Sequence, residues 1–115
     1  MICERQSMDK KSLTAVARQQ LKLAATATSG RSSQTIYGGH AQTLRQTVVG
    51  LTAGQSLAEH DNFGDATLLV LSGTLTLISG ANEWKGSAGD LLVVPKARHS
   101  VKAVDDVAFL LTVAK

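Results

Sequence analysis

Two histidines, His60 and His99, are the side chains of this chain best suited to chemistry in a pocket. They stand at the two ends of a series of short apolar stretches separated by glycines, and Asn62 follows His60 by two positions. Because alternate residues of a strand point to the same face, we expect His60 and Asn62 to enter the same space. An imidazole in such a place can ligate a divalent metal or hydrogen-bond a small molecule.

A metal held by these residues would be bound weakly. Divalent transition metals need three or four nitrogen, oxygen or sulfur donors for tight binding. His60 and His99 supply two donors, and Asn62 adds a weak carbonyl oxygen. Strand alternation turns Glu59 away from the face of His60, and Gln46 would help only if its side chain turns inward. Zn, Fe, Mn or Ni at His60 and His99 is therefore one expectation.

The alternative is a pocket in which the histidines hydrogen-bond a ligand or water, or merely fill the opening. The residues expected to line such a pocket come from several predicted strands: His60, Asn62, His99, Gln46 and Trp84. For Trp84, packing at the rim is the competing role. No serine lies in a recognisable nucleophile elbow, so the sequence assigns no catalytic residue.

Composition restricts the class of protein that positions these side chains. A chain of 115 residues is one domain, and with 43% hydrophobic but only 3% aromatic residues its core must be aliphatic. The net charge of +3 is mild and its basic residues are scattered, which argues against nucleic acid as a partner. Cys3 is the single cysteine, so no disulfide forms within the chain. Without a signal-peptide pattern or a membrane-spanning apolar run, we expect a cytoplasmic protein that does not engage a membrane.

The first third of the chain contains one helical pattern. Apolar residues recur every three or four positions over residues 9–26, at Leu13, Val16, Ala17, Leu21 and Ala24. Asp9 or Ser12 is placed to cap the start of this helix. We expect the helix to pack on its own domain or on a second subunit, rather than on a membrane. Residues 1–8 are predicted to be a disordered tail, and residues 31–34 a polar linker, so that residues 9–33 form a helix and linker.

From residue 34 to residue 115 the pattern is that of short strands. Apolar residues alternate or run together between glycine turns that recur every eight to twelve residues, which is typical of an antiparallel sandwich or barrel. Ser72-Gly73 is predicted to be a hairpin turn, and residues 91–94 a buried strand. The aliphatic residues expected to supply the core are Leu68, Val70, Leu75, Leu77, Leu92, Val94 and Leu110.

These features resemble the cupin superfamily, in particular its small single-domain members of the cupin-2 conserved barrel type. The resemblance covers residues 42–114. Gly54, His60 and Gly73 match the first cupin motif, and Gly89, Pro95 and His99 match the second; the most specific stretch is Gly89-Asp-Leu-Leu-Val-Val-Pro95. The resemblance implies an all-β fold, an antiparallel jelly-roll β-barrel with one N-terminal α-helix outside it. It also implies a homodimer.

The family's metal site, three histidines and a glutamate, is matched only in part. His60 and His99 stand where the first and third histidines are expected. Asn62 replaces the second histidine, and Ala66, or Thr67 by a looser spacing, replaces the glutamate. The resemblance thus implies a cupin with a degenerate metal site.

Three functions are compatible with this sequence. The first is a non-catalytic module that binds or senses a small-molecule ligand. The second is a metal-dependent cupin enzyme, a dioxygenase or isomerase, that uses His60 and His99. The third is an interaction module that modulates a transcription regulator. The two replaced ligand positions favour the first function over the second.

Overall fold

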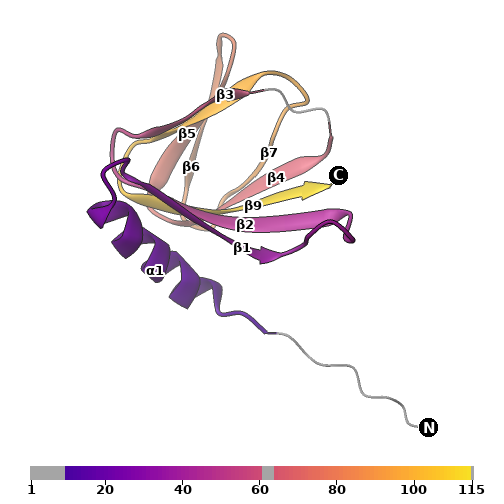
Figure 1. Ribbon diagram of the computed structural model, residues 1–115. Helices are drawn as coiled ribbons and strands as arrows, with labels where there is room; N and C mark the ends of the chain where they lie inside the picture. Colours follow the sequence, from indigo (N-terminus) through magenta and orange to yellow (C-terminus); the bar gives the residue numbers. More distant parts are fainter. Residues whose placement is uncertain (1–9, 61–63, 115) are drawn as a thin grey trace, which may run out of the picture.

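The computed structural model describes residues 10–60 and 64–114 as one helix and nine strands in two sheets (Figure 1). The predicted tail, residues 1–8, and Asn62 lie outside the described residues. The elements in chain order are α1 (Leu13–Thr26), β1 (Arg31–Tyr37), β2 (Leu44–Leu51), β3 (Ser56–His60), β4 (Ala66–Ser72), β5 (Thr74–Ser79), β6 (Asn82–Ser87), β7 (Leu91–Val93), β8 (His99–Ala103) and β9 (Val107–Ala114).

All strand pairs are antiparallel, as the sequence predicts. Sheet A has the order β1-β2-β9-β4-β7, and sheet B, which faces it, has the order β3-β8-β5-β6. Within the described strands, only β1–β2 and β5–β6 join neighbours of the same sheet, whereas every other connection crosses from one sheet to the other. The predicted all-β antiparallel fold with one N-terminal helix is confirmed.

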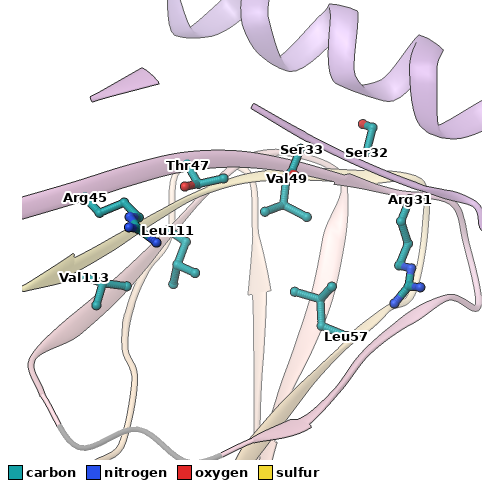
Figure 2. A pocket seen from close by; sticks show the side chains of 9 residues that line it. All are labelled: Arg31, Ser32, Ser33, Arg45, Thr47, Val49, Leu57, Leu111 and Val113. Atoms are coloured by element: carbon teal, nitrogen blue, oxygen red, sulfur yellow. The ribbon is translucent and has the colours of Figure 1, made fainter. Parts of the chain in front are cut away.

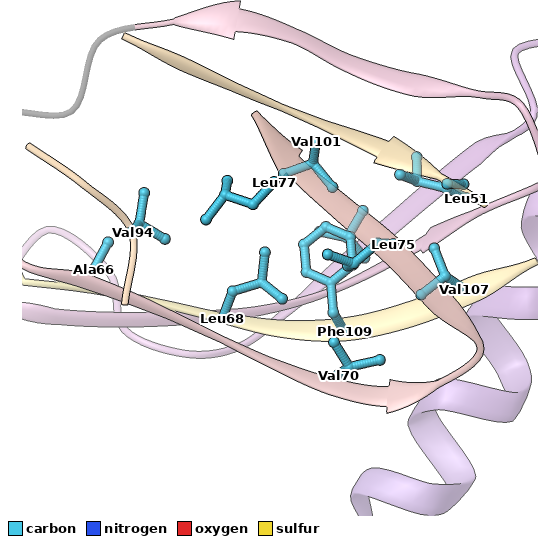
Figure 3. Close-up of a cluster of buried hydrophobic side chains, with 12 residues drawn as sticks. Leu51, Ala66, Leu68, Val70, Leu75, Leu77, Val94, Val101, Val107 and Phe109 are labelled. Carbon is cyan, nitrogen blue, oxygen red and sulfur yellow. The ribbon is translucent and has the colours of Figure 1, made fainter. Parts of the chain in front are cut away.

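The core lies between the two sheets and is aliphatic around one aromatic side chain. Phe109 of β9 is fully buried and is surrounded by Leu, Val and Ala from both sheets (Figure 3). Six of the seven core residues predicted from the sequence are buried: Leu68, Val70, Leu75, Leu77, Val94 and Leu110. Leu92 is partly buried against this cluster. Leu110 does not point into the space between the sheets. It follows Phe109 on β9, so its side chain faces the opposite side of sheet A, which α1 covers.

Helix α1 begins at Leu13, four residues later than the sequence pattern suggests. The Ser12 hydroxyl accepts a hydrogen bond from the N–H of Ala15 (3.2 Å), so Ser12 is the cap. The helix covers the outer face of sheet A over β1, β2, β9 and β4 (Figure 1). Ala17, Gln20 and Ala24 are its buried residues. No helix among the described residues is long and apolar enough to cross a membrane.

Residues 31–34 are not a linker but the first half of strand β1. Arg31 pairs with Leu51 and Ser33 with Val49 across the β1–β2 ladder. These residues are polar because β1 is an edge strand, in which few side chains are buried. Its main-chain hydrogen bonds to β2, and not burial of its side chains, hold it in the sheet.

Strand β7 is also an edge strand, and the prediction that residues 91–94 are uniformly buried is wrong. Leu91 and Val93 are 62% and 75% exposed on the outer face of sheet A, whereas Leu92 and Val94 point inward. Helix α1 does not extend over β7, so the outer face of this strand is uncovered. The continuous apolar run in the sequence does not indicate which of the strand's two faces is buried.

The predicted hairpin at Ser72-Gly73 is wrong as well. Strands β4 and β5 belong to different sheets, so Gly73 is the point where the chain crosses between them. Its φ of +81° lies in the region that favours glycine, and a Cβ atom built there would overlap the carbonyl oxygen of Asp106.

Gly73→Ala is expected to destabilise the protein more than Gly54→Ala. Both glycines have positive φ, +81° and +87°, so each alanine adds about 1–2 kcal/mol of backbone strain. At Gly54 no atom lies within 4 Å of the added Cβ, whereas at Gly73 the backbone of Asp106 must move. We expect a further ~2 kcal/mol from this overlap, measured by urea unfolding. Equal losses in the two variants would show that the contact with Asp106 carries no cost.

Gln20→Met is expected to stabilise the protein. Gln20 lies on the side of α1 that faces sheet A and is 2% exposed. Its Nε2 donates to Oε1 of the exposed Gln34 (3.3 Å), but its own Oε1 has no hydrogen-bond partner. Removing an unsatisfied buried oxygen should raise the free energy of unfolding by about 1 kcal/mol. Gln19→Met, on the exposed side of the same helix turn, is the matched control. A loss of stability in Gln20→Met would show that the amide is better satisfied than the geometry indicates.

Candidate functional site

A pocket of about 490 Å³ opens between the β1–β2–β9 part of sheet A and strand β3 (Figure 2). We call it the arginine pocket. It is lined by Arg31, Ser32 and Ser33 of β1, Arg45, Thr47 and Val49 of β2, Leu57 of β3, and Leu111 and Val113 of β9.

The register of β2 with β9 explains how the pocket arises. Inward-facing residues pair across the two strands as Leu51 with Val107, Val49 with Phe109, Thr47 with Leu111 and Arg45 with Val113. Along this row, Leu51, Val107 and Phe109 are fully buried, whereas Leu111 and Val113 are partly buried and Arg45 is exposed. One end of this row of side chains is therefore part of the closed core, and the other end lines the open pocket.

The walls of the pocket are apolar, and charge is confined to its ends. Val49, Leu111 and Val113 lie on one wall, with Leu57 opposite (Figure 2). The Thr47 hydroxyl is within 3.2 Å of the Thr35 hydroxyl, so it already has a hydrogen-bond partner. Figure 2 shows Arg31 and Arg45 at opposite ends of the pocket. The nine lining residues include no acidic side chain.

His99 of β8 is not among the residues that line the arginine pocket. It is 5% exposed, and its Nδ1 lies 3.0 Å from the carbonyl oxygen of Ala97. The β3–β8 ladder pairs the backbone of His99 with that of His60. The two histidines therefore lie opposite each other on neighbouring strands. The described part of His60 is its backbone, and Asn62 lies outside the described residues.

The other two predicted pocket residues lie elsewhere. Gln46 shares a face of β2 with Val48, and its Nε2 donates to Oγ1 of Thr112 (3.2 Å) on the outer face of sheet A. The structure therefore does not bring Gln46 together with His99. Trp84 of β6 is 44% exposed at the opposite edge of the sandwich, where it lines a separate depression of about 430 Å³ with Leu77 and Leu92.

Solved structures of similar shape identify the fold. An RmlC-like cupin protein from Desulfovibrio desulfuricans is 25% identical over 73% of this chain and 81% of its own, with a TM-score of 0.65. A cupin 2 conserved barrel domain protein from Salinispora arenicola is 17% identical over 96% and 91% of the two chains, with a TM-score of 0.69. The chain belongs to the cupin superfamily. The predicted membership of the cupin superfamily is thereby confirmed.

A further similar structure leaves the role of this cupin open. A conserved protein of unknown function from Streptococcus pyogenes is 29% identical over 77% of each chain, with a TM-score of 0.69. No protein-family model matches the cupin sequence, and no curated protein is significantly similar to it.

The metal-ligand set can be followed only in part among the described residues of this cupin. Among residues 10–60 and 64–114, as far as side chains are described, no three His, Cys, Asp or Glu side chains are grouped to hold a metal ion. Ala66, at the position where the family resemblance implies a glutamate, is 7% exposed within the aliphatic core and has no donor atom. His99 is thus the one described side chain of the expected ligand set with a strong donor.

Sequence reasoning missed the arginines of this cupin because it treated residues 31–34 as a linker. One signal was present. In residues 44–51, Arg45, Thr47, Val49 and Leu51 alternate with Leu44, Gln46 and Val48, so both faces carry apolar residues. Apolar content alone does not determine which face turns inward. Helix α1 covers the face with Val48, and that leaves Arg45 on the pocket side.

The metal content of the purified protein tests whether the incomplete set of ligands binds a metal only weakly. After dialysis against Zn²⁺, Mn²⁺, Fe²⁺ or Ni²⁺ and removal of loosely bound ions, the untagged protein is expected to retain far less than about one metal per chain, because tight sites need three or four donors. A stoichiometric metal that is lost in both His60→Ala and His99→Ala would contradict this expectation. His40→Ala, which removes an exposed histidine, is the control.

Proposed function

We propose that this cupin is a non-catalytic module that binds a small molecule in the arginine pocket. The observation on which the proposal depends is the pocket itself: about 490 Å³, with apolar walls and polar ends, between the facing sheets. Ligand sites in proteins are typically concave, about 300–1,000 Å³ in volume and mostly apolar, with a few polar groups that fix the ligand's orientation.

The walls of the pocket supply the driving force for binding. Val49, Leu57, Leu111 and Val113 present aliphatic surface to a ligand from two sheets. Each buried methylene of a ligand contributes about 0.8 kcal/mol toward offsetting the entropic cost of association, so affinity should grow with the length of the alkyl portion that the walls cover.

The residue types of the lining support binding rather than catalysis. The only ionisable side chains among the nine are Arg31 and Arg45. A guanidinium stays charged and so does not act as a general acid or base. The Ser33 and Thr47 hydroxyls have no histidine or carboxylate beside them in the lining, and a hydroxyl nucleophile needs an adjacent base.

A substitution that fills the pocket should abolish binding while preserving the fold. Leu57 is partly buried on β3 and faces Val49 and Leu111 across the pocket, so the indole of Leu57→Trp would occupy the ligand's space. We expect octanol, octanoate or octylamine to raise the melting temperature of the wild type. The affinity of whichever probe binds should fall at least about tenfold in Leu57→Trp, measured by calorimetry.

Leu23→Trp is the matched control, because Leu23 is 47% exposed on α1, away from the pocket. It should bind the probe as the wild type does. If Leu57→Trp remains folded, by circular dichroism, and binds the probe with unchanged affinity, the ligand site is elsewhere and the proposal is wrong. Failure of all three probes to bind would also count against it.

A further inference from the structure

We infer that the arginine pocket takes an elongated ligand with an apolar middle and an anionic group at each end, of the chemical class of α,ω-dicarboxylates. This inference rests on the proposed binding function and adds the class of ligand. It follows from the positions of Arg31 and Arg45, from what lies between them, and from the absence of acidic side chains among the described residues of the lining.

The two arginines lie on the same face of sheet A but far apart along it. Arg31 of β1 pairs with Leu51 of β2, and Arg45 is six positions from Leu51 along β2. At about 3.3 Å per residue, the backbone positions of the two arginines are separated by roughly 20 Å. Side chains stand roughly perpendicular to a sheet, so a single carboxylate does not engage both guanidiniums.

The space between the arginines is suited to a hydrocarbon chain. Val49 and Leu111 lie between the two arginine side chains, and Leu57 faces them from β3 (Figure 2). Thr47, the polar residue at the centre of the row, directs its hydroxyl to Thr35. A ligand with a polar middle would lose hydration in this space, where the hydroxyls available to it are those of Ser33 and the already paired Thr47.

The charge of the two ends has one sign. Among the described residues, neither Arg31 nor Arg45 forms an ion pair, and no acidic residue lines the pocket. Guanidinium groups bind carboxylates through two parallel hydrogen bonds, which fixes position as well as charge. An anionic group at each end of a ligand would therefore satisfy both arginines at once.

A comparison of ligands of equal length tests the inference. Binding of sebacate, decanoate and decanediol is measured by calorimetry at low ionic strength in the wild type, Arg31→Gln and Arg45→Gln. Sebacate should bind at least about tenfold more tightly than decanoate. Each substitution should weaken sebacate about tenfold, whereas decanoate, with one anionic end, should respond strongly to one substitution only. Decanediol should bind most weakly and respond to neither.

Arg18→Gln is the matched control, since it removes the same charge from an exposed position of α1. It should leave sebacate binding unchanged, because pairing at the pocket is local. Equal affinities for sebacate and decanoate, or a sebacate affinity that does not change in either arginine variant, would overturn the inference. If, in those cases, Leu57→Trp still abolishes binding of the probes, the arginine pocket is a ligand site and only the inference of a ligand with two anionic ends is wrong.

Discussion

The pairing of β2 with β9 is the interaction on which the rest of the structure depends. These two strands lie beside each other within sheet A, and their inward row begins with fully buried Leu51, Val107 and Phe109. The same row ends with the half-buried or exposed residues of the pocket. Because one continuous ladder holds both ends, the packing that joins the two sheets also determines where the space between them stays open. A change that shifts this register by one residue would exchange the pocket row for the row beneath α1.

His99 does not line the arginine pocket, and of His60 only the backbone is described. His60 and His99 pair across β3 and β8, where the fold's motifs lead one to look for chemistry, but Ala66 occupies an aliphatic site where a metal ligand would have to be. The arginines lie on β1 and β2, outside the motif segments. Under the proposed binding function, the energy would come from apolar walls and fixed positive charge, neither of which needs a metal.

Period and glycine spacing were sufficient to predict an antiparallel β fold, the β2 strand at residues 44–51, and most of the core, whereas the jelly-roll fold came from the resemblance to cupins. What they did not predict has a common cause. Strand β1 and the outward side chains of β7 lie at the edges of sheet A, where hydrogen bonding rather than burial defines a strand, and the apolar pattern is weak or misleading there. The inward direction of Arg45 depends on which face α1 covers, and that is a tertiary contact without a local sequence signal.

Strand β9 lies between β2 and β4, yet it is the last strand along the chain. The chain is synthesised from its N-terminus, so β2 and β4 are made well before β9, which lies between them and pairs with both. Among the described strands, only the β1–β2 and β5–β6 hairpins can pair from sequence neighbours during synthesis. Until residues 107–114 emerge, β2 and β4 each have an unpaired edge that can associate with another chain. Assembly of sheet A therefore has to wait for residues 107–114, and this pairing of strands distant in sequence is of the kind that slows folding.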